Sequence, residues 1–286
     1  ISHHKVTSRS HWGLVRGTLG MLRKARERGV DITCDLYPYL ATSTSLTATL
    51  PHWAHEGGLE KLIFRIRDAS LKLKILDDLV LNQSPAGWHN IVISGVTTRS
   101  NKGLEGKNIA DIASAKGLKP EEVVLKVIEE EEGNVGMIRF AMCEDDLEEV
   151  LRDDLSMIGS DGGSLADYGV LAKGKPHPRN FGTFPRILAK YWRERKLFSL
   201  ERAVYKMTGF PSWRFGLQDR GLIRKGMAAD LLIFDPATIQ DEATYAEPFQ
   251  YPTGIAKVIV AGEVVVDQGK HTGALPGRVL SREVFS

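Results

Sequence analysis

The chain has 286 residues, of which 42% are hydrophobic and 26% charged, an ordinary composition for a soluble globular protein of one large domain or two average domains. Its 38 Lys and Arg residues nearly balance 36 Asp and Glu residues, and no basic block occurs, so neither a nucleic acid nor a membrane is indicated as a partner. Cys34 and Cys143 form no CxxC pair, and no apolar run reaches the roughly 18 residues of a membrane span, which favours a cytoplasmic protein without a disulfide framework.

The first six residues, Ile1 to Val6, have the composition of a strand, in which successive side chains point to opposite faces. His3 and His4 would then diverge, and Lys5 would share the face of His3. An isolated pair of histidines near a chain end is more often a surface feature than a metal site. The chain does not start with Met, and we expect an earlier part of the protein to be missing from it.

A helix and a second strand come next. Residues 17–28 carry leucines at helical spacing and precede Gly29, a favourable residue after a helix end. Residues 30–35 predict a short strand that leads into Leu36-Tyr37-Pro38-Tyr39. Strand, helix, strand is the order of a parallel β/α unit, so Tyr37 would lie at the ligand-binding end of the strand. The Ser- and Thr-rich residues 41–49 are too polar for a core strand and predict a loop that lines a pocket.

Residues 51–85 form a predicted insertion, with one helix expected over residues 59–81. His52 and His55 within it are more typical of surface packing beside Trp53 than of metal ligation. Beyond the insertion, strands are expected at residues 88–94 and 135–142, and helices begin near Ile109, at Pro120 and over residues 144–152.

The stretch around which the chain is organised is Met157-Ile158-Gly159-Ser160-Asp161-Gly162-Gly163. It predicts a buried strand that ends in a carboxylate, followed by glycines that let a ligand approach the backbone, as in α/β barrels. An ordinary Asp-Gly turn is the competing interpretation. Two helices are then expected over residues 187–195 and 200–207, the second capped by Ser199.

The last 67 residues are rich in strand-forming sequence. Residues 229–236 have the pattern of a buried strand, and residues 255–260 and 263–266 flank Ala261-Gly262 as a hairpin. A small β domain beside the α/β part is therefore predicted.

Collinear motifs over nearly the whole chain resemble the carboxyl-terminal half of D-aminoacylases, the N-acyl-D-amino-acid deacylases of the amidohydrolase superfamily. The matching segments are Ile1-Ser2-His3-His4-Lys5, Asp35-Leu36-Tyr37-Pro38-Tyr39, Gly159-Ser160-Asp161-Gly162, His177-Pro178-Arg179, Gly182-Thr183-Phe184-Pro185-Arg186, Lys206-Met207-Thr208-Gly209, Asp219-Arg220-Gly221, Gly226-Met227-Ala228-Ala229-Asp230 and Gly254-Ile255. The resemblance implies an α/β fold. Residues 1–218 would be the carboxyl-terminal part of a (β/α)8, TIM-like metal-dependent hydrolase barrel, with the insertion at 51–85, and residues 219–286 would be part of a small β-sandwich domain.

The resemblance also implies zinc held by a Cys and two His, sometimes with a second, weaker metal site. His3 matches one of those ligands, and the remaining ligands would lie upstream of Ile1. Asp161 matches the carboxylate that takes a proton from the attacking water and delivers it to the leaving amine. Arg179 matches the clamp for the substrate carboxylate, with Tyr37, Ser43 and Lys5 as supporting substrate-binding residues.

Three functions stay open at this stage. The first is hydrolysis of an N-acyl-D-amino acid with a neutral or hydrophobic side chain, since Thr49 and Leu50 are uncharged where relatives preferring D-glutamate carry a basic residue. The second is a cyclic amidase of the hydantoinase or dihydroorotase kind. The third is an inactive half-barrel fragment. An active protein would need the amino-terminal half of the barrel as its partner besides a small-molecule substrate, and the oligomeric state is left open.

Overall fold

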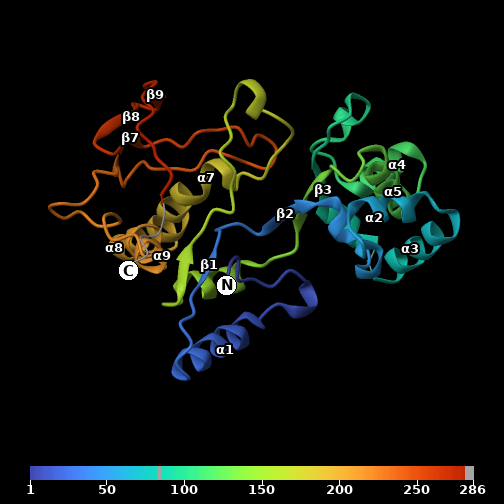
Figure 1. The fold of residues 1–286 in the computed structure, drawn as a ribbon, viewed down its shortest axis with the longest axis horizontal. Coiled ribbons are helices and arrows are strands. Elements are labelled where there is room, and N and C mark those ends of the chain that lie inside the picture. Colours follow the sequence, from blue (N-terminus) through green and yellow to red (C-terminus); the bar gives the residue numbers. More distant parts are fainter. Residues whose placement is uncertain (83–84, 281–286) are drawn as a thin grey trace.

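The computed structural model describes residues 1–82 and 85–280. The chain forms two bodies joined by the extended segments around β2 (Figure 1). The first body contains β1, α1 and α7 to α9, and the second body contains α2 to α5. The helices are α1 (Val15–Glu27), α2 (Leu59–Arg67), α3 (Ala69–Asn82), α4 (Ile109–Lys116), α5 (Pro120–Glu130), α6 (Glu144–Arg152), α7 (Arg179–Arg186), α8 (Leu200–Met207) and α9 (Gly209–Phe215). The strands are β1 (Cys34–Leu36), β2 (Ala41–Ser45), β3 (Ile91–Gly95), β4 (Gly136–Phe140), β5 (Ser156–Ile158), β6 (Leu231–Phe234), β7 (Ile255–Val260), β8 (Glu263–Asp267) and β9 (Lys270–His271).

The first body is built on the parallel pair β1 and β5, in which Cys34 lies opposite Ser156 and Leu36 opposite Ile158. Helix α1 buries Val15, Leu19 and Leu22, which lie on one face at helical spacing, and packs against α6. The prediction of this helix is confirmed. Gly29 follows its end with a φ of +85°, which glycine adopts without strain.

The prediction of a strand at residues 1–6 is wrong. His3 has a φ of +53°, in the left-handed region, so the segment cannot run as an extended strand. It is held to β1 by single backbone bonds, from the His4 N–H to the Asp35 carbonyl (2.8 Å) and from the Asp35 N–H to the Ile1 carbonyl (3.1 Å). His3 and His4 do diverge, but the cause is this backbone bend. The His4 ring meets Thr18 on α1 instead.

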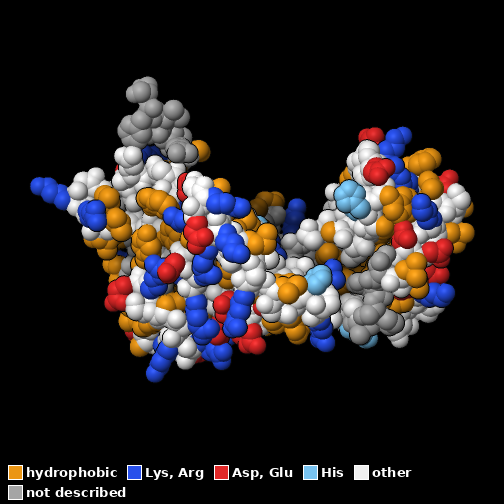
Figure 2. Space-filling model, turned by 90° about the horizontal axis from the view of Figure 1, so that it is seen from below, with side chains coloured by type: hydrophobic (Ala, Val, Ile, Leu, Met, Phe, Trp, Pro, Cys, Tyr) orange, Lys and Arg blue, Asp and Glu red, His pale blue; other side chains and the backbone are white. Residues whose placement is uncertain are grey.

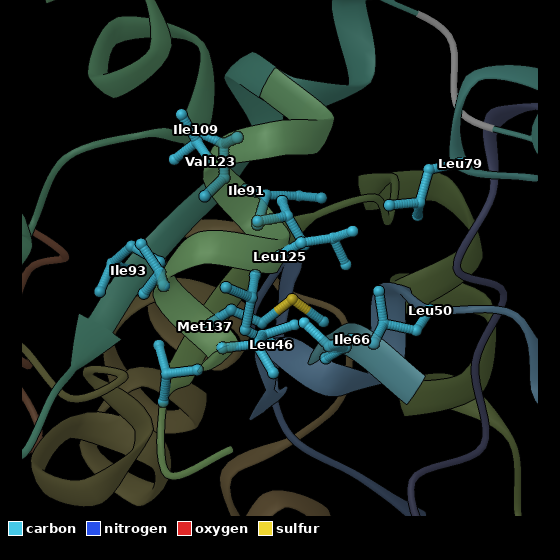
Figure 3. Packing of buried hydrophobic residues seen from close by; sticks show 14 of the residues in the cluster. Leu46, Leu50, Ile66, Leu79, Ile91, Ile93, Ile109, Val123, Leu125 and Met137 are labelled. Carbon is cyan, nitrogen blue, oxygen red and sulfur yellow. The ribbon is translucent and has the colours of Figure 1, made fainter. Parts of the chain in front are cut away.

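The second body contains the antiparallel sheet β2-β4-β3 and helices α2 to α5. Its core includes residues from β3, β4, α2 and α5, as Figure 3 shows for Ile91, Met137, Ile66 and Leu125. The prediction of a loop at residues 41–49 is wrong for residues 41–45, which form β2. Strand β4 supplies the backbone partners for this polar segment, from Ala41 opposite Phe140 to Ser45 opposite Gly136.

The helix expected over residues 59–81 is divided into α2 and α3. Asp68 has an extended backbone and its side chain accepts bonds from the N–H groups of Ser70 and Leu71, so it ends one helix and caps the next. The predicted insertion at 51–85 falls in this body, except that residues 83 and 84 lie outside the described residues. The helices predicted near Ile109, at Pro120 and over residues 144–152 are confirmed as α4, α5 and α6.

Downstream of β5, α7 continues into a helix with π-type bonding over residues 187–194, η7, which corresponds to the helix expected there. The next predicted helix is confirmed as α8, and the Ser199 side chain caps it by accepting a bond from the Arg202 N–H. Among the described residues no helix is long and apolar enough to cross a membrane.

The tail forms one four-stranded antiparallel sheet in the order β6-β7-β8-β9. The predicted hairpin is confirmed, and Ala261 and Gly262 turn with φ values of +50° and +85°, as a two-residue hairpin turn requires. The strand predicted within residues 229–236 is confirmed as β6, but it is not buried, because β6 lies at the sheet edge and Leu232 and Ile233 are 46% and 49% exposed. Residues 281–286 of the predicted sandwich portion lie outside the described residues.

Candidate active site

Five of the six residues that the sequence singles out meet at the ends of β1 and β5. The Asp161 carboxylate lies 2.8 Å from Arg179 Nη1 and 3.4 Å from His3 Nε2. The Tyr37 ring lies 4.9 Å from the Arg179 guanidinium, 5.2 Å from the Lys5 ammonium and 5.8 Å from the His3 ring. An acid, an imidazole, two cations and a phenol thus surround one point.

The two parallel strands bring these groups together. Tyr37 directly follows β1, and Asp161 follows β5 after Gly159 and Ser160. A Cβ on Gly159 would lie 3.0 Å from Asp35 Oδ1, so a larger residue would require the Asp35 side chain to move by a few tenths of an ångström. Asp35 Oδ1 in turn accepts a bond of 3.0 Å from the His3 N–H, which ties His3 to the end of β1.

Arg179 is only 8% exposed, and its charge is met by Asp161 on one side and by the Tyr37 ring on the other. The fully buried Tyr37 keeps its proton, because burial raises the pKa of its hydroxyl to about 12. Burial, together with the nearby Arg179 charge, lowers the pKa of Lys5, while Asp161 acts in the opposite direction. Lys5 also donates a bond of 2.9 Å to the carbonyl of His3.

His177 lies behind Arg179 and is 1% exposed. Its Nδ1 accepts a bond of 3.0 Å from the Arg179 N–H, and its Nε2 lies 3.1 Å from the carbonyl oxygen of Ala41 on β2. Burial, reinforced by the Arg179 charge, lowers the His177 pKa to about 3, so the imidazole is neutral. The sequence motif contained this histidine but assigned it no role.

The remaining motif residues form the support of this cluster. The half-buried Arg186 donates to the carbonyl of Pro38 (2.8 Å), pairs with Asp241 (2.8 Å) and covers the Tyr39 ring. Gly182 passes so close to Tyr39 and Asp241 that a Cβ would lie 2.6 Å from the Tyr39 hydroxyl. The Tyr-Pro-Tyr and Gly-Thr-Phe-Pro-Arg motifs are therefore packed against each other.

Strand β5 is held from the opposite end by Lys206, which is fully buried on α8. Its ammonium donates to the carbonyls of Asp153 (2.5 Å) and Ser156 (2.7 Å), which flank the start of the strand. Burial lowers the Lys206 pKa to about 8. This contact explains the first residue of the Lys-Met-Thr-Gly motif as a structural group.

Ser43 stands apart from the other five predicted site residues. It lies on β2, on the sheet face that Ala41 and Phe140 share, and is partly exposed. No described contact joins its side chain to Asp161 or Arg179. A pocket of about 330 Å³ lies beside Arg179, and its lining consists of Arg179 together with Ser160, Gly162, Gly163, Ser164, Leu165, Asn180, Phe181, Thr183, Phe184 and Tyr251.

His3 and Asp161 are the adjacent groups with the chemistry of metal ligands, an imidazole nitrogen and a carboxylate. Among residues 1–82 and 85–280, no three His, Cys, Asp or Glu side chains gather closely enough to hold a metal ion. The pair has the donor types of part of a metal site. His52 and His55 lie on a 3-10 turn of the other body, where His52 is exposed and His55 is half-buried.

The family model described as "Amidohydrolase family" matches residues 4–266. The chain belongs to the amidohydrolase family. The fold is that of this family as well: a solved structure of an N-acyl-D-glutamate deacylase from Bordetella bronchiseptica, in complex with zinc and a phosphonate inhibitor, matches with a TM-score of 0.73 at 32% identity. That match covers 94% of this chain and 46% of the solved chain.

Two curated amidohydrolase relatives from Alcaligenes xylosoxydans xylosoxydans match nearly end to end. A D-aminoacylase is 34% identical and an N-acyl-D-glutamate deacylase 32% identical, each over 99% of this chain. The chain spans about half the length of these relatives, 48% in each case. The resemblance inferred from the motifs is thereby confirmed.

Proposed function

We propose that this chain supplies the carboxyl-terminal half of the active site of a zinc-dependent hydrolase that cleaves N-acyl-D-amino acids. The observation that carries the proposal is Asp161, which contacts both a metal-ligand type of side chain, His3, and a buried arginine, Arg179. A carboxylate in that position lies between the side chain that would hold the metal and the arginine that would bind the substrate carboxylate. Relatives with this activity span the whole chain.

His3 would be one zinc ligand, with the others supplied by the amino-terminal half, and some members hold a second, weaker metal. When bound, zinc would polarise the acyl carbonyl and lower the pKa of a water molecule. Asp161 accepts the proton of the attacking water on a carboxylate oxygen and then donates it to the amine nitrogen that leaves. The products are a carboxylate and a D-amino acid.

Arg179 would bind the α-carboxylate of the substrate. Its guanidinium has five N–H donors in one plane, so it can hold a carboxylate through two of them. Tyr37 keeps the guanidinium in place from one face and Lys5 adds a second cation beside it. Ser43, on the neighbouring strand, would be a more distant hydrogen-bond donor.

We propose a neutral or hydrophobic side chain for the substrate. Leu50 is buried in the core of the second body, and the hydroxyl of Thr49 donates to the carbonyl of Leu46. Neither position offers the cation that an acidic side chain needs. A barrel completed by an amino-terminal half, with the tail sheet as part of a β-sandwich, is the architecture that this function requires.

A substrate panel tests the proposal, with the zinc-loaded protein supplied with its amino-terminal half. We expect turnover of N-acetyl-D-leucine, slower turnover of N-acetyl-D-glutamate, and no hydrolysis of the L-enantiomers. A hydantoin and dihydroorotate belong in the same panel. Faster opening of either ring would replace the deacylase assignment with a cyclic amidase, and inactivity on every compound would leave a non-catalytic protein.

A further inference from the structure

We propose that His177 is a positioning residue that sets Arg179 for recognition of a substrate carboxylate, by capping the helix that Arg179 begins. The inference rests on the proposed function for the identity of the ligand. It assigns to His177 a role that depends on both ring nitrogens at once, with no proton transfer to the substrate.

The first step of the argument is the start of α7. The first N–H groups of a helix have no partner within the helix, and a side chain before it usually supplies one. Pro178 occupies the cap position of α7 and has no side-chain acceptor. His177 Nδ1 takes over that function and accepts the N–H of Arg179, the first residue of the helix, at 3.0 Å.

The second step is the anchor of the ring itself. Because Nδ1 accepts a bond from a backbone N–H, the neutral ring must carry its proton on Nε2. That N–H points at the Ala41 carbonyl, 3.1 Å away on β2. The rings of Tyr39 and Tyr245 lie 5.0 and 5.1 Å away in edge-on contact, which fixes the ring plane.

The third step connects this anchor to the guanidinium. Arg179 is nearly buried, and its side chain runs from the capped backbone to Asp161 and Tyr37. A shift of the first turn of α7 therefore moves the guanidinium with it. His177 links β2 to the beginning of α7, so the second body and the carboxylate-binding arginine are joined through one imidazole.

Two amide substitutions separate the roles of the two ring nitrogens. His177→Asn keeps an acceptor near Nδ1 and loses the donor to Ala41, whereas His177→Gln can still reach Ala41 but leaves the Arg179 N–H without a partner. His52→Gln, an exposed histidine of the other body, is the matched control. Each variant is assayed, with its amino-terminal half, on an N-acyl-D-amino acid and on the same compound with its α-carboxylate replaced by a carboxamide.

We expect His177→Gln to raise KM for the acid by about tenfold or more, as for loss of a buried hydrogen bond, with a much smaller change for the carboxamide. His177→Asn should raise it less, and His52→Gln should match the parent. Equal losses on the acid and the carboxamide would overturn the proposal, because His177 would then act on the fold and not through Arg179.

Hydrogen exchange of the Arg179 amide gives a readout that needs no turnover. Its protection should fall in His177→Gln and persist in His177→Asn, and a [15N]histidine spectrum should show His177 as the Nε2–H form. Unchanged protection of the Arg179 amide in both variants would refute the cap. If the two variants differ in protection of the Arg179 amide as expected, but the protein hydrolyses no N-acyl-D-amino acid, only the proposed function is rejected.

Discussion

His3 and Asp161, the two residues in contact at the centre of the site, share an unusual backbone. Both have positive φ values, +53° and +49°, although neither is glycine. A left-handed conformation costs a non-glycine residue about 1 to 2 kcal/mol. Such strain persists where surrounding contacts over-determine it, and here the Asp35 carboxylate holds the N–H of His3. The strain turns both side chains toward one another.

Asp161→Asn removes the proton acceptor while it keeps the size of the side chain. We expect kcat to fall by at least about 100-fold, in line with the loss of general acid–base catalysis, and zinc to stay bound. Steady-state kinetics and metal analysis of the zinc-loaded protein check both parts. Substantial residual turnover would remove Asp161 from the mechanism.

Arg179→Ala should weaken substrate binding more than it slows the chemical step. Loss of a charge-assisted bond is worth about 1.5 to 3 kcal/mol, which corresponds to KM raised roughly 10- to 150-fold. Arg16→Ala, an arginine with a 78% exposed side chain on α1, is the control. Unchanged KM and kcat in Arg179→Ala would rule out the carboxylate clamp.

At the scale of elements, the segment that precedes His177 is held against β3. The Lys175 N–H donates to the Ser94 carbonyl at 2.6 Å, and the Lys175 ammonium donates to the carbonyl of Ala246 at 2.8 Å. This segment therefore connects the second body, the tail and the residues that lead into α7. Its position bears on the site through His177 and Arg179.

Two glycines of this segment provide a matched pair of variants. Gly169 and Gly174 have φ values of +65° and +71°, but only Gly174 is packed, since a Cβ there would lie 2.5 Å from the Ser94 oxygen. Gly169→Ala should cost about 1 to 2 kcal/mol from the backbone alone, and Gly174→Ala should cost clearly more. Chemical denaturation measures the difference. Equal costs would show that the contact with Ser94 does not hold the segment.

The turn after β3 depends on one buried carboxylate, Glu131. Burial by itself would raise its pKa, but bonds from Thr97, Thr98 and Asn101 more than offset that effect and lower the pKa to about 2. The carboxylate accepts the N–H groups of Thr97 (2.6 Å) and Thr98 (3.0 Å). A single charged group thus organises the turn.

Because the folded-state pKa of Glu131 lies below its unfolded value, its contribution is complete above about pH 4.5 and disappears as the pH falls toward 2. Glu131→Gln should lower the free energy of unfolding by about 1 to 3 kcal/mol at pH 7, with the difference narrowing below pH 4.5. Glu60→Gln, exposed on α2, is the control. A deficit that is constant from pH 7 to pH 3 would contradict the assignment.

At the scale of the whole molecule, a hollow separates the two bodies, as the space-filling view in Figure 2 shows. Several large apolar side chains on the first body are exposed, including Trp213 (58%), Phe215 (64%) and Ile223 (91%). The edge strand β6 adds Leu232 and Ile233. An apolar surface of this kind favours contact with another chain segment, in agreement with the proposed need for an amino-terminal half.

That proposal predicts the behaviour of the chain on its own. With His3 as its one contributed zinc imidazole, the isolated 31.7 kDa chain should bind much less than one zinc per chain, because a single imidazole holds zinc weakly. Intact mass together with metal analysis decides the matter. Stoichiometric zinc at 31.7 kDa would mean that this chain completes the site without a partner.

Features that depend on local rules could be predicted from the amino-acid sequence. Helix α1 with Gly29, the cap of α8 at Ser199 and the hairpin turn at Ala261 depend on residues a few positions apart. The strand pattern also singled out Asp161 and Tyr37, which follow predicted parallel strands, and the family resemblance added Arg179.

The remaining features depend on contacts between segments far apart in the sequence. Strand β2 exists because β4, almost a hundred residues later, supplies its hydrogen bonds, and no local pattern encodes that partner. His3 turns back because Asp35 captures its N–H, and His177 has a role only because α7 and the carbonyl of Ala41 meet at one ring. These contacts join groups distant in sequence, so their energy depends on the folded arrangement and not on residue type.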